Sequence, residues 1–378
     1  MEHKFFSQSI SPGRVIRGEE AWLEGKKLIS NISRKPLLLG RSKNTSKRRE
    51  ILFKELESFS LKVTSLELKY DCCEIDLERI QSISSRSNCD SIIATGGGKV
   101  LDAGKIIAER LNVPCITIPL SAATCAGWSA LSNIYSSSGS FIKDIPLKRC
   151  PDILIFDHSL IREAPPQTLA SGIADALAKW YESSISSGSS ADGIVQQAVQ
   201  MARVLRDQIL IDGLEAYKNN MSDQWIRTAE GCALSAGLVG GIGGSKCRTA
   251  AAHALHNGLS QLQFRKKPLH GELVGFGIIV QLKLEEKLFK NQLARQARIQ
   301  LQELLRDLNI PLTLNDLGLS DIRHEALEEA CLFSCRNGMG IENLPFHVSS
   351  NDLLNAMKEV SEEESNFLAK KKVSGKIN

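Results

Sequence analysis

The stretch that decides the fold covers residues 91–100 and reads SIIATGGGKV. Its first four residues form an apolar run typical of a buried strand, and residues 100–111 have the apolar periodicity of a helix. A strand that passes through three glycines directly into a helix is typical of a β-α-β unit. This stretch therefore predicts a parallel sheet with helices on both faces.

The three glycines also predict a binding site. They remove every Cβ from a place where a ligand can approach the backbone, and the following helix start offers N–H groups with a partial positive charge. These features favour a pyrophosphate, to which Lys99 adds a cation. The alternative is a tight turn without a ligand. The run is not GxGxxG, and Val100 replaces the Ser or Thr of a P-loop, which disfavours ATP hydrolysis.

Outward from this turn, the chain shows two kinds of pattern. Further apolar runs typical of buried strands are residues 36–39, 115–118 and 153–156, and 47–58 is an amphipathic helical stretch between them. Beyond Pro165 and Pro166 the long segments have helical periodicity; they are residues 170–183, 194–210, 224–238, 280–305 and 351–361. We therefore predict an α/β domain over residues 1–162 and an all-α helical domain over 163–378.

Composition excludes several classes of protein. The 378 residues are 42% hydrophobic and 24% charged, which is typical of a globular chain and not of a disordered one. The formal net charge of +4 is too small to predict binding to nucleic acid or a membrane surface. No stretch reaches the ~18 apolar residues of a membrane-spanning helix. Ten cysteines are too few for a disulfide scaffold, so we expect reduced thiols and a cytoplasmic location.

Three polar residues stand in apolar surroundings of the second half. Asp175 lies in GIADALAK, His253 in AAHALHNG and His270 in LHGE. A buried carboxylate needs a partner, and one carboxylate with two imidazoles would form a three-ligand metal site with an open position for a substrate oxygen. The alternative is that each histidine is a hydrogen-bonded core residue. His256 shares a helix face with His253, so it is a second ligand candidate or a packing residue.

Taken together, five segments resemble the iron-containing alcohol dehydrogenase superfamily, and its glycerol-dehydrogenase-like branch in particular. They are ISPGRV at 10–15, GGGKVLDAGK at 96–105, GIADA at 172–176, AHALHNG at 252–258 and HGE at 270–272. The resemblance implies a Rossmann-like α/β domain followed by a helical domain, the dehydroquinate synthase-like fold. It also implies NAD or NADP on the glycine turn and one divalent metal, zinc or iron, in the helical part.

The resemblance extends to single residues. The metal ligands it implies are Asp175, His253 and His270, which leaves His256 beside the metal as a catalytic candidate that could pass a proton to solvent. The cofactor contacts it implies are Gly97, Gly98, Lys99, Thr117, Ser129, Leu131 and Tyr135.

Two departures from glycerol dehydrogenases bear on specificity. Cys125, which we count among the residues of the cofactor site, stands where those enzymes carry an Asp that hydrogen-bonds a polyol. A site without that negative charge suits a 2-hydroxy or 2-oxo acid better than glycerol. Arg41 stands after the first predicted strand, where NAD-using relatives often carry an Asp, and Ser42 and Lys43 follow it. These residues favour the 2′-phosphate of NADP, unless they form only a solvated basic loop.

We therefore predict an NAD(P)-linked, metal-dependent dehydrogenase that interconverts a small alcohol, a polyol or a 2-hydroxy acid, and its carbonyl. We expect a small-molecule substrate, no nucleic-acid or membrane partner, and a homo-oligomer. The enzyme alternatives are a dehydroquinate-synthase-like lyase and a glycerol-1-phosphate dehydrogenase, and the non-enzyme alternative is a nucleotide-binding protein without turnover. The sequence does not distinguish zinc from iron.

Overall fold

The computed structural model describes residues 7–244 and 247–374, which divide into two compact units. The first unit comprises the chain up to Leu169 together with Ala229–Gly244. The second comprises Ala170–Thr228 and the chain beyond Gly244. An α/β part and a helical part are confirmed, whereas the division at residue 162 stays a prediction.

A parallel sheet forms the centre of the first unit, with six strands within the described residues. In order across the sheet they are β1 (Arg14–Gly18), β8 (Ile153–Asp157), β5 (Cys115–Pro119), β4 (Ser91–Gly96), β2 (Pro36–Gly40) and β3 (Thr64–Glu67). Every residue of the four inner strands is buried, as their continuous apolar runs predict. The edge strands β1 and β3 alternate or mix exposed and half-buried positions.

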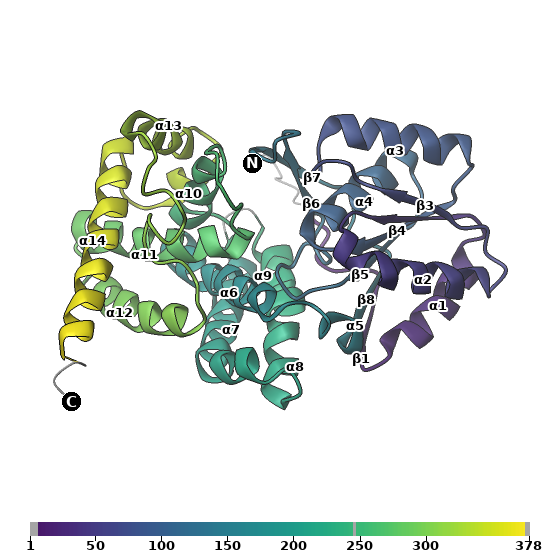
Figure 1. The fold of residues 1–378 in the computed structure, drawn as a ribbon, viewed down its shortest axis with the longest axis horizontal. Helices are drawn as coiled ribbons and strands as arrows, with labels where there is room; N and C mark the ends of the chain where they lie inside the picture. The colour runs from purple at the N-terminus through teal and green to yellow at the C-terminus, as the bar shows by residue number, and fades with distance from the viewer. Residues whose placement is uncertain (1–6, 245–246, 375–378) are drawn as a thin grey trace. The chain divides into compact units, whose positions relative to one another are not determined.

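Helices cover both faces of this sheet. Figure 1 shows α1 (Ala21–Ile32) and α2 (Ser46–Glu57) on one face, and α3 (Glu74–Arg86) and α4 (Gly98–Leu111) on the other. The core under α1 and α2 includes Trp22, Leu52 and Ile155. The unit also contains η1 (Lys43–Thr45), the hairpin of β6 (Leu131–Tyr135) and β7 (Phe141–Pro146), α5 (His158–Ile161) and α9 (Ala236–Gly243).

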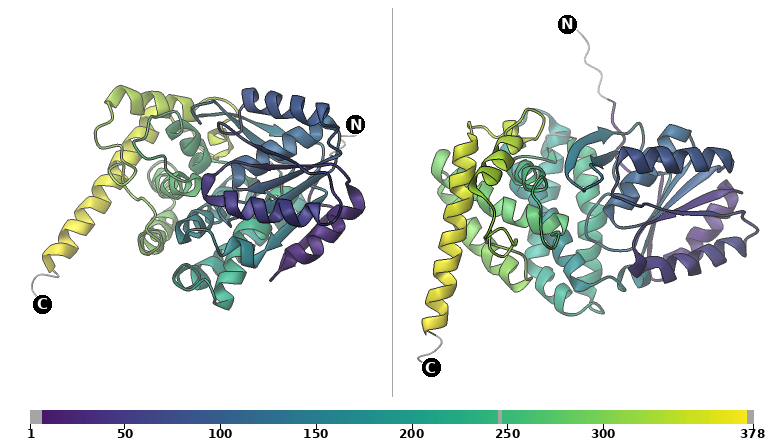
Figure 2. Two further views of the ribbon diagram at one scale, coloured as in Figure 1. Left: turned by 45° about the vertical axis from the view of Figure 1, so that its right-hand side comes forward. Right: turned by 45° about the horizontal axis from the view of Figure 1, so that its top comes forward.

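The second unit is helical throughout its described residues. Its elements are α6 (Pro166–Ser187, which begins in the first unit), α7 (Gly193–Lys218), α8 (Asp223–Glu230), α10 (Ala251–Leu259), α11 (His270–Leu288), α12 (Gln292–Asp307), α13 (His324–Ser334), η4 (Ile341–Asn343) and α14 (Ser350–Ser374). The buried helix α11 packs against α10, α12 and α14. Figure 2 shows α14 as the long yellow helix at the C-terminal end of this unit.

Two of the expected helices differ from the structure. The helix expected over 224–238 consists of α8, a π-helical turn at Gly231–Ser235, and α9 (Ala236–Gly243). The single helix expected over 280–305 is wrong, because the chain breaks between α11 and α12. Lys290 takes a left-handed conformation with φ 58°, and the Asn291 side chain accepts a hydrogen bond from Leu293 N at 3.2 Å as the N-cap of α12.

No helix among the described residues is long and apolar enough to cross a membrane.

Candidate metal centre and nucleotide-binding turn

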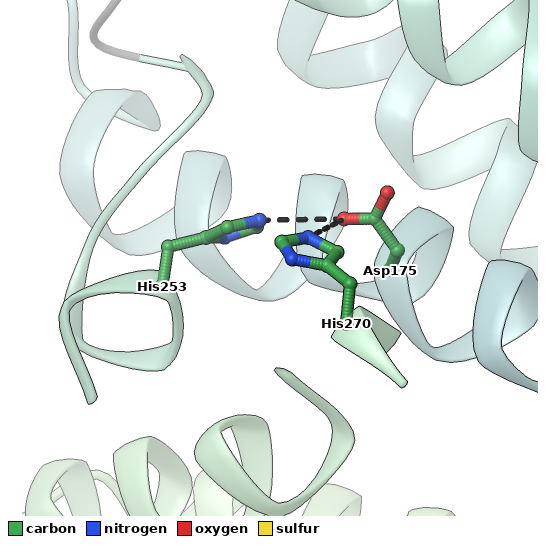
Figure 3. A group of neighbouring side chains, drawn as sticks. All are labelled: Asp175, His253 and His270. Carbon is green, nitrogen blue, oxygen red and sulfur yellow. Dashed lines mark ion pairs between the residues drawn. The ribbon is translucent and has the colours of Figure 1, made fainter. Parts of the chain in front are cut away.

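Asp175, His253 and His270 converge within the second unit. One ligand atom from each lies within 4.8 Å of the other two. Figure 3 shows both imidazoles directed at the same Asp175 oxygen. The distances to Asp175 Oδ1 are 3.3 Å from His253 Nε2 and 3.5 Å from His270 Nε2.

Close packing of α6, α10 and α11 brings the three residues together. His270 is the first residue of α11, and Gly271 N donates a hydrogen bond to Ser171 Oγ of α6 at 2.9 Å. A Cβ on Gly271 would lie 1.8 Å from the Ser171 carbonyl oxygen, so a larger residue cannot occupy this position. Because Ser171 precedes Asp175 by one helical turn, this approach places the start of α11 beside the carboxylate.

A second buried carboxylate, that of Glu182, orients the His253 ring from the side away from Asp175. Glu182 Oε2 lies 2.5 Å from His253 Nδ1, and Oε1 accepts hydrogen bonds from the backbone N–H groups of Ala250 and His253 at 2.7 and 3.0 Å. Glu182 thereby fixes Nδ1 as a donor, so Nε2, which faces Asp175, is the nitrogen that would bind a metal once it loses its proton. Burial lowers the pKa of His253, but the charge of Glu182 and both carboxylate contacts outweigh it and raise the pKa to about 9.

His256 orients the ring of His270 in a corresponding way. His270 Nδ1 lies 2.9 Å from His256 Nε2, and His256 Nδ1 lies 2.9 Å from Asn257 Oδ1. Since the Asn257 oxygen can only accept, His256 Nδ1 donates to it and His256 Nε2 accepts from His270. Burial holds the pKa of His256 well below its usual range, and His270 and His253 add to this, so the ring is neutral. Both of its nitrogens are therefore engaged in orienting His270.

The donor set fits a divalent metal. No donor among the described residues makes a hydrogen bond of good geometry to Asp175 Oδ1, although this oxygen is buried and two imidazoles face it. Burial acts to raise the pKa of Asp175, but Lys179 and the two imidazoles hold it well below its usual range. A three-ligand zinc or iron site offers the same donor set. It consists of an ionised oxygen and two imidazole nitrogens that converge on one point without hydrogen bonds of good geometry between them.

The local sequence carries a signal for two further polar residues beside Asp175. Asp175, Lys179 and Glu182 lie at i, i+4 and i+7 on α6, and all three are buried. This spacing places them on one helix face within an otherwise apolar stretch. A search for polar residues at helical spacing around Asp175 would have found both Lys179 and Glu182.

In the first unit, the glycine turn joins β4 to α4 as predicted. Gly96 has φ 155°, which a residue with a Cβ rarely adopts, and Gly97 precedes the first helical residue, Gly98. A Cβ on Gly98 would approach Thr124 Cγ2 to 2.8 Å. A Cβ on Gly97 would have no protein atom within 4 Å, so this position opens onto space that a ligand can occupy.

A buried carboxylate, Asp71, joins two of the residues expected to bind the nucleotide. It forms ion pairs with Arg41, which follows β2, and with Lys99 at the start of α4. Lys99 Nζ also lies 4.5 Å from the centre of the Tyr135 ring, where the ring face attracts a cation. Arg41, Lys99 and Tyr135 are thus brought together, and Asp71, which no local pattern indicated, links the two cations.

The remaining residues expected at the cofactor site lie around the loop after β5. The Thr117 hydroxyl is fully buried and donates to Gly127 O at 2.8 Å, so it holds the loop. Lys105 is buried, pairs with Asp102 at 3.1 Å and donates to the carbonyls of Ser129 and Leu131. Cys125 is half-buried, and its carbonyl accepts from Trp128 N at 2.9 Å.

A Rossmann-like unit with a glycine turn, together with an Asp-His-His cluster in a helical unit, defines the class of nucleotide-linked, metal-dependent oxidoreductases. Comparison with known proteins supports the same class. Residues 12–158 match the family model described as iron-containing alcohol dehydrogenase.

Relatives that align over most of the chain extend this match beyond residue 158. The chain is 41% identical over 358 residues to an uncharacterized oxidoreductase of Synechocystis sp., covering 95% of this chain and 92% of the relative. It is 31% identical to a glycerol dehydrogenase of Thermotoga maritima and to hydroxycarboxylate dehydrogenase A of Escherichia coli, each over 76% of this chain and 79% of the relative. The crystal structure of glycerol dehydrogenase from Schizosaccharomyces pombe superposes with a TM-score of 0.84 at 24% identity, covering 98% of this chain and 94% of that one.

The chain belongs to the iron-containing alcohol dehydrogenase family. It is an enzyme that interconverts an alcohol and a carbonyl compound, with a nicotinamide nucleotide and a divalent metal as cofactors. The predicted fold class and general reaction are therefore confirmed.

Proposed function

We propose that Asp175, His253 and His270 hold the catalytic metal of a dehydrogenase acting on a small polyol or 2-hydroxy acid. The observation that carries this proposal is the approach of their three ligand atoms to within 4.8 Å of one another. Glu182 and His256 support it, because each fixes the orientation of one imidazole from the side away from Asp175. Two histidines and one carboxylate suit zinc and iron alike, and we propose one of these two metals.

The protein's own side chains would position the reactants. When bound, the metal supplies Lewis acidity and the nicotinamide ring accepts or donates the hydride. Glu182 and His256 keep both Nε2 atoms directed at the same point. His256 was predicted to move a proton. With both of its ring nitrogens engaged, we assign it first to positioning His270, and proton transfer through it stays a prediction.

We propose that the turn at Gly97, Gly98 and Lys99 binds the pyrophosphate of the nucleotide and that Arg41 confers a preference for NADP. Arg41 and Lys99 both form ion pairs with Asp71, which holds the two cations together beside the turn where phosphate groups would bind. The roles of Thr117, Cys125, Ser129, Leu131 and Tyr135 in cofactor binding stay predictions.

We also propose a cytoplasmic homo-oligomer. The location rests on the ten cysteines, all of which are thiols and eight of which are buried.

A substrate panel on metal-defined protein tests the function. Polyols are supplied with NAD⁺ or NADP⁺, 2-oxo acids and aldehydes are supplied with NADH or NADPH, and nicotinamide absorbance is followed. We expect net consumption of reduced nucleotide with a carbonyl substrate, and loss of it when a chelator removes the metal. Turnover of a phosphorylated acid without net change in nucleotide would favour the lyase, and nucleotide binding without metal or turnover would favour a binding protein.

A further inference from the structure

Gln281 is a buried residue of α11 whose side-chain amide joins the three helices that carry the proposed metal ligands. Its exposed fraction is 0%. Nε2 donates to the carbonyl oxygen of Tyr181 on α6 at 2.8 Å, and Oε1 accepts from the backbone N–H of Ala252 on α10 at 3.1 Å. Because a carbonyl only accepts and a backbone N–H only donates, these two partners fix the orientation of the amide. Nε2 also donates to Glu285 Oε1 at 3.1 Å, so both kinds of polar atom in the side chain are used.

The start of α10 depends on such partners because its own N-cap supplies none. The first N–H groups of an α-helix have no partner inside the helix, and a Ser, Thr, Asp or Asn at the N-cap commonly accepts from one of them. The N-cap of α10 is Ala250, which has no side-chain oxygen. Side chains of two other helices replace it, since Gln281 accepts from Ala252 N and Glu182 of α6 accepts from His253 N at 3.0 Å. The position of this turn is therefore set from α6 and α11.

Close packing of α10 against α11 brings Gln281 to this turn. Gly277 lies one helical turn before Gln281, and a Cβ on it would lie 2.5 Å from the carbonyl oxygen of Ala252. The two backbones thus approach each other at the residue whose N–H Gln281 binds. Because Ala252 directly precedes His253, a displacement of this turn would move the His253 ring relative to Asp175 and His270.

We propose that Gln281 is a positioning residue of the metal centre, which holds the start of α10 so that His253 Nε2 meets the other two ligand atoms. This inference rests on the proposed metal centre at Asp175, His253 and His270. Glu182 orients the His253 ring, whereas Gln281 fixes the backbone that carries it. An amide suits this place because it offers an acceptor and two donors without a charge. An apolar side chain would leave the buried Ala252 N–H without this acceptor.

Two matched variants test the proposal on the full chain. Gln281→Met and Gln302→Met each replace a buried glutamine by an apolar side chain of similar length. Gln302 is the control, because it lies on α12 and its amide donates to Glu364 Oε2 of α14 at 3.3 Å. Competition with a chelator measures zinc affinity, and the absorption spectrum of bound cobalt(II) reports the arrangement of the ligands.

Three further measurements complete the experiment. Thermal unfolding of the metal-free proteins measures the purely structural effect of each substitution. The zinc content of Asp175→Asn tests whether the metal binds at the proposed ligands. Hydrogen exchange of the Ala252 amide in metal-free wild type tests the turn itself without any substitution.

The expected results separate positioning from folding. Gln281→Met should weaken zinc affinity by about 10- to 100-fold and change the cobalt(II) spectrum, because the start of α10 is no longer fixed. Gln302→Met should leave both unchanged. Both variants should unfold at a lower temperature than wild type in the absence of metal, because each loses the hydrogen bonds of a buried amide. The Ala252 amide of metal-free wild type should exchange slowly, since Gln281 holds it before any metal binds.

The opposite results would overturn the inference. A Gln281→Met protein that is less stable but keeps the zinc affinity and cobalt(II) spectrum of wild type would make Gln281 a residue of folding alone. Fast exchange of the Ala252 amide in metal-free wild type would show that Gln281 does not hold this turn, even if Gln281→Met fails to fold. Full zinc content in Asp175→Asn would instead refute the proposed metal centre itself.

Discussion

The sequence specifies the glycine turn and the metal cluster in different ways. The turn is one contiguous stretch of backbone, in which Gly96 permits the bend and Gly97 leaves space beside the helix start. The cluster is built from side chains on three helices, and Asp175 and His270 are 95 positions apart. Local sequence therefore suffices to find the turn, whereas the cluster depends on packing and on a second set of polar groups behind its ligands. The predictions below test this difference.

The largest effect is expected when a metal ligand loses its charge. Asp175→Asn should lower metal content to background and turnover by on the order of 10³-fold or more, because a neutral amide is a poor third ligand. Elemental analysis and nicotinamide absorbance measure the two quantities. Full metal content with undiminished turnover would show that the metal lies elsewhere.

A smaller effect on metal binding is expected at Glu182, which contacts the ligand His253. Glu182→Gln should weaken metal affinity by about 10- to 100-fold, since His253 loses the carboxylate that orients it. Competition with a fluorescent chelator measures this affinity. Glu364→Gln is the matched control, because Glu364 is also a buried carboxylate but pairs with Arg306 on α12, and it should leave the affinity unchanged.

The glycine turn allows ligand binding to be separated from folding. Gly97→Ala should leave thermal stability unchanged, because a Cβ there meets no protein atom, yet weaken nucleotide binding by roughly 10-fold. Gly193→Ala at the start of α7 is the control, since a Cβ there also has no neighbour within 4 Å. Equal nucleotide affinity in both variants, measured by fluorescence titration, would argue against a ligand at Gly97.

The smallest effect concerns the choice of nucleotide. Arg41→Asp should shift the ratio of affinities for NADPH and NADH toward NADH by about fivefold or more, because the new carboxylate repels a 2′-phosphate and the pair with Asp71 is lost. Lys62→Asp, just before β3 at the amino ends of the strands, makes the same charge change and should not move the ratio. A constant ratio in Arg41→Asp would mean that this arginine has no role in nucleotide choice.

The fold could be predicted from the sequence where a short segment is buried at every residue. The four inner strands carry continuous apolar runs, and all four were predicted. The edge strands β1 and β3 read RVIRG and TSLE, which are short and partly exposed, so no apolar run marks them. The break between α11 and α12 was missed because apolar residues continue on both sides of Lys290.

The site could be predicted only in part, for a related reason. The residues at 175, 253 and 270 stand out as polar groups among Ala, Leu and Gly, and a family resemblance joined them. His256, which orients His270, was singled out from the sequence, whereas Glu182, which orients His253, was missed. Asp71 bridges residues that are 58 positions apart, and no pattern in one sequence connects them. Partners of this kind follow from tertiary packing and not from local propensity.

The most direct test of the metal centre is anomalous diffraction from crystals of zinc- or iron-loaded protein, with data collected on both sides of the absorption edge of that metal. The account predicts a single peak about 2.0–2.3 Å from Asp175 Oδ1, His253 Nε2 and His270 Nε2. A peak bound by other residues, with these three side chains unligated, would contradict it.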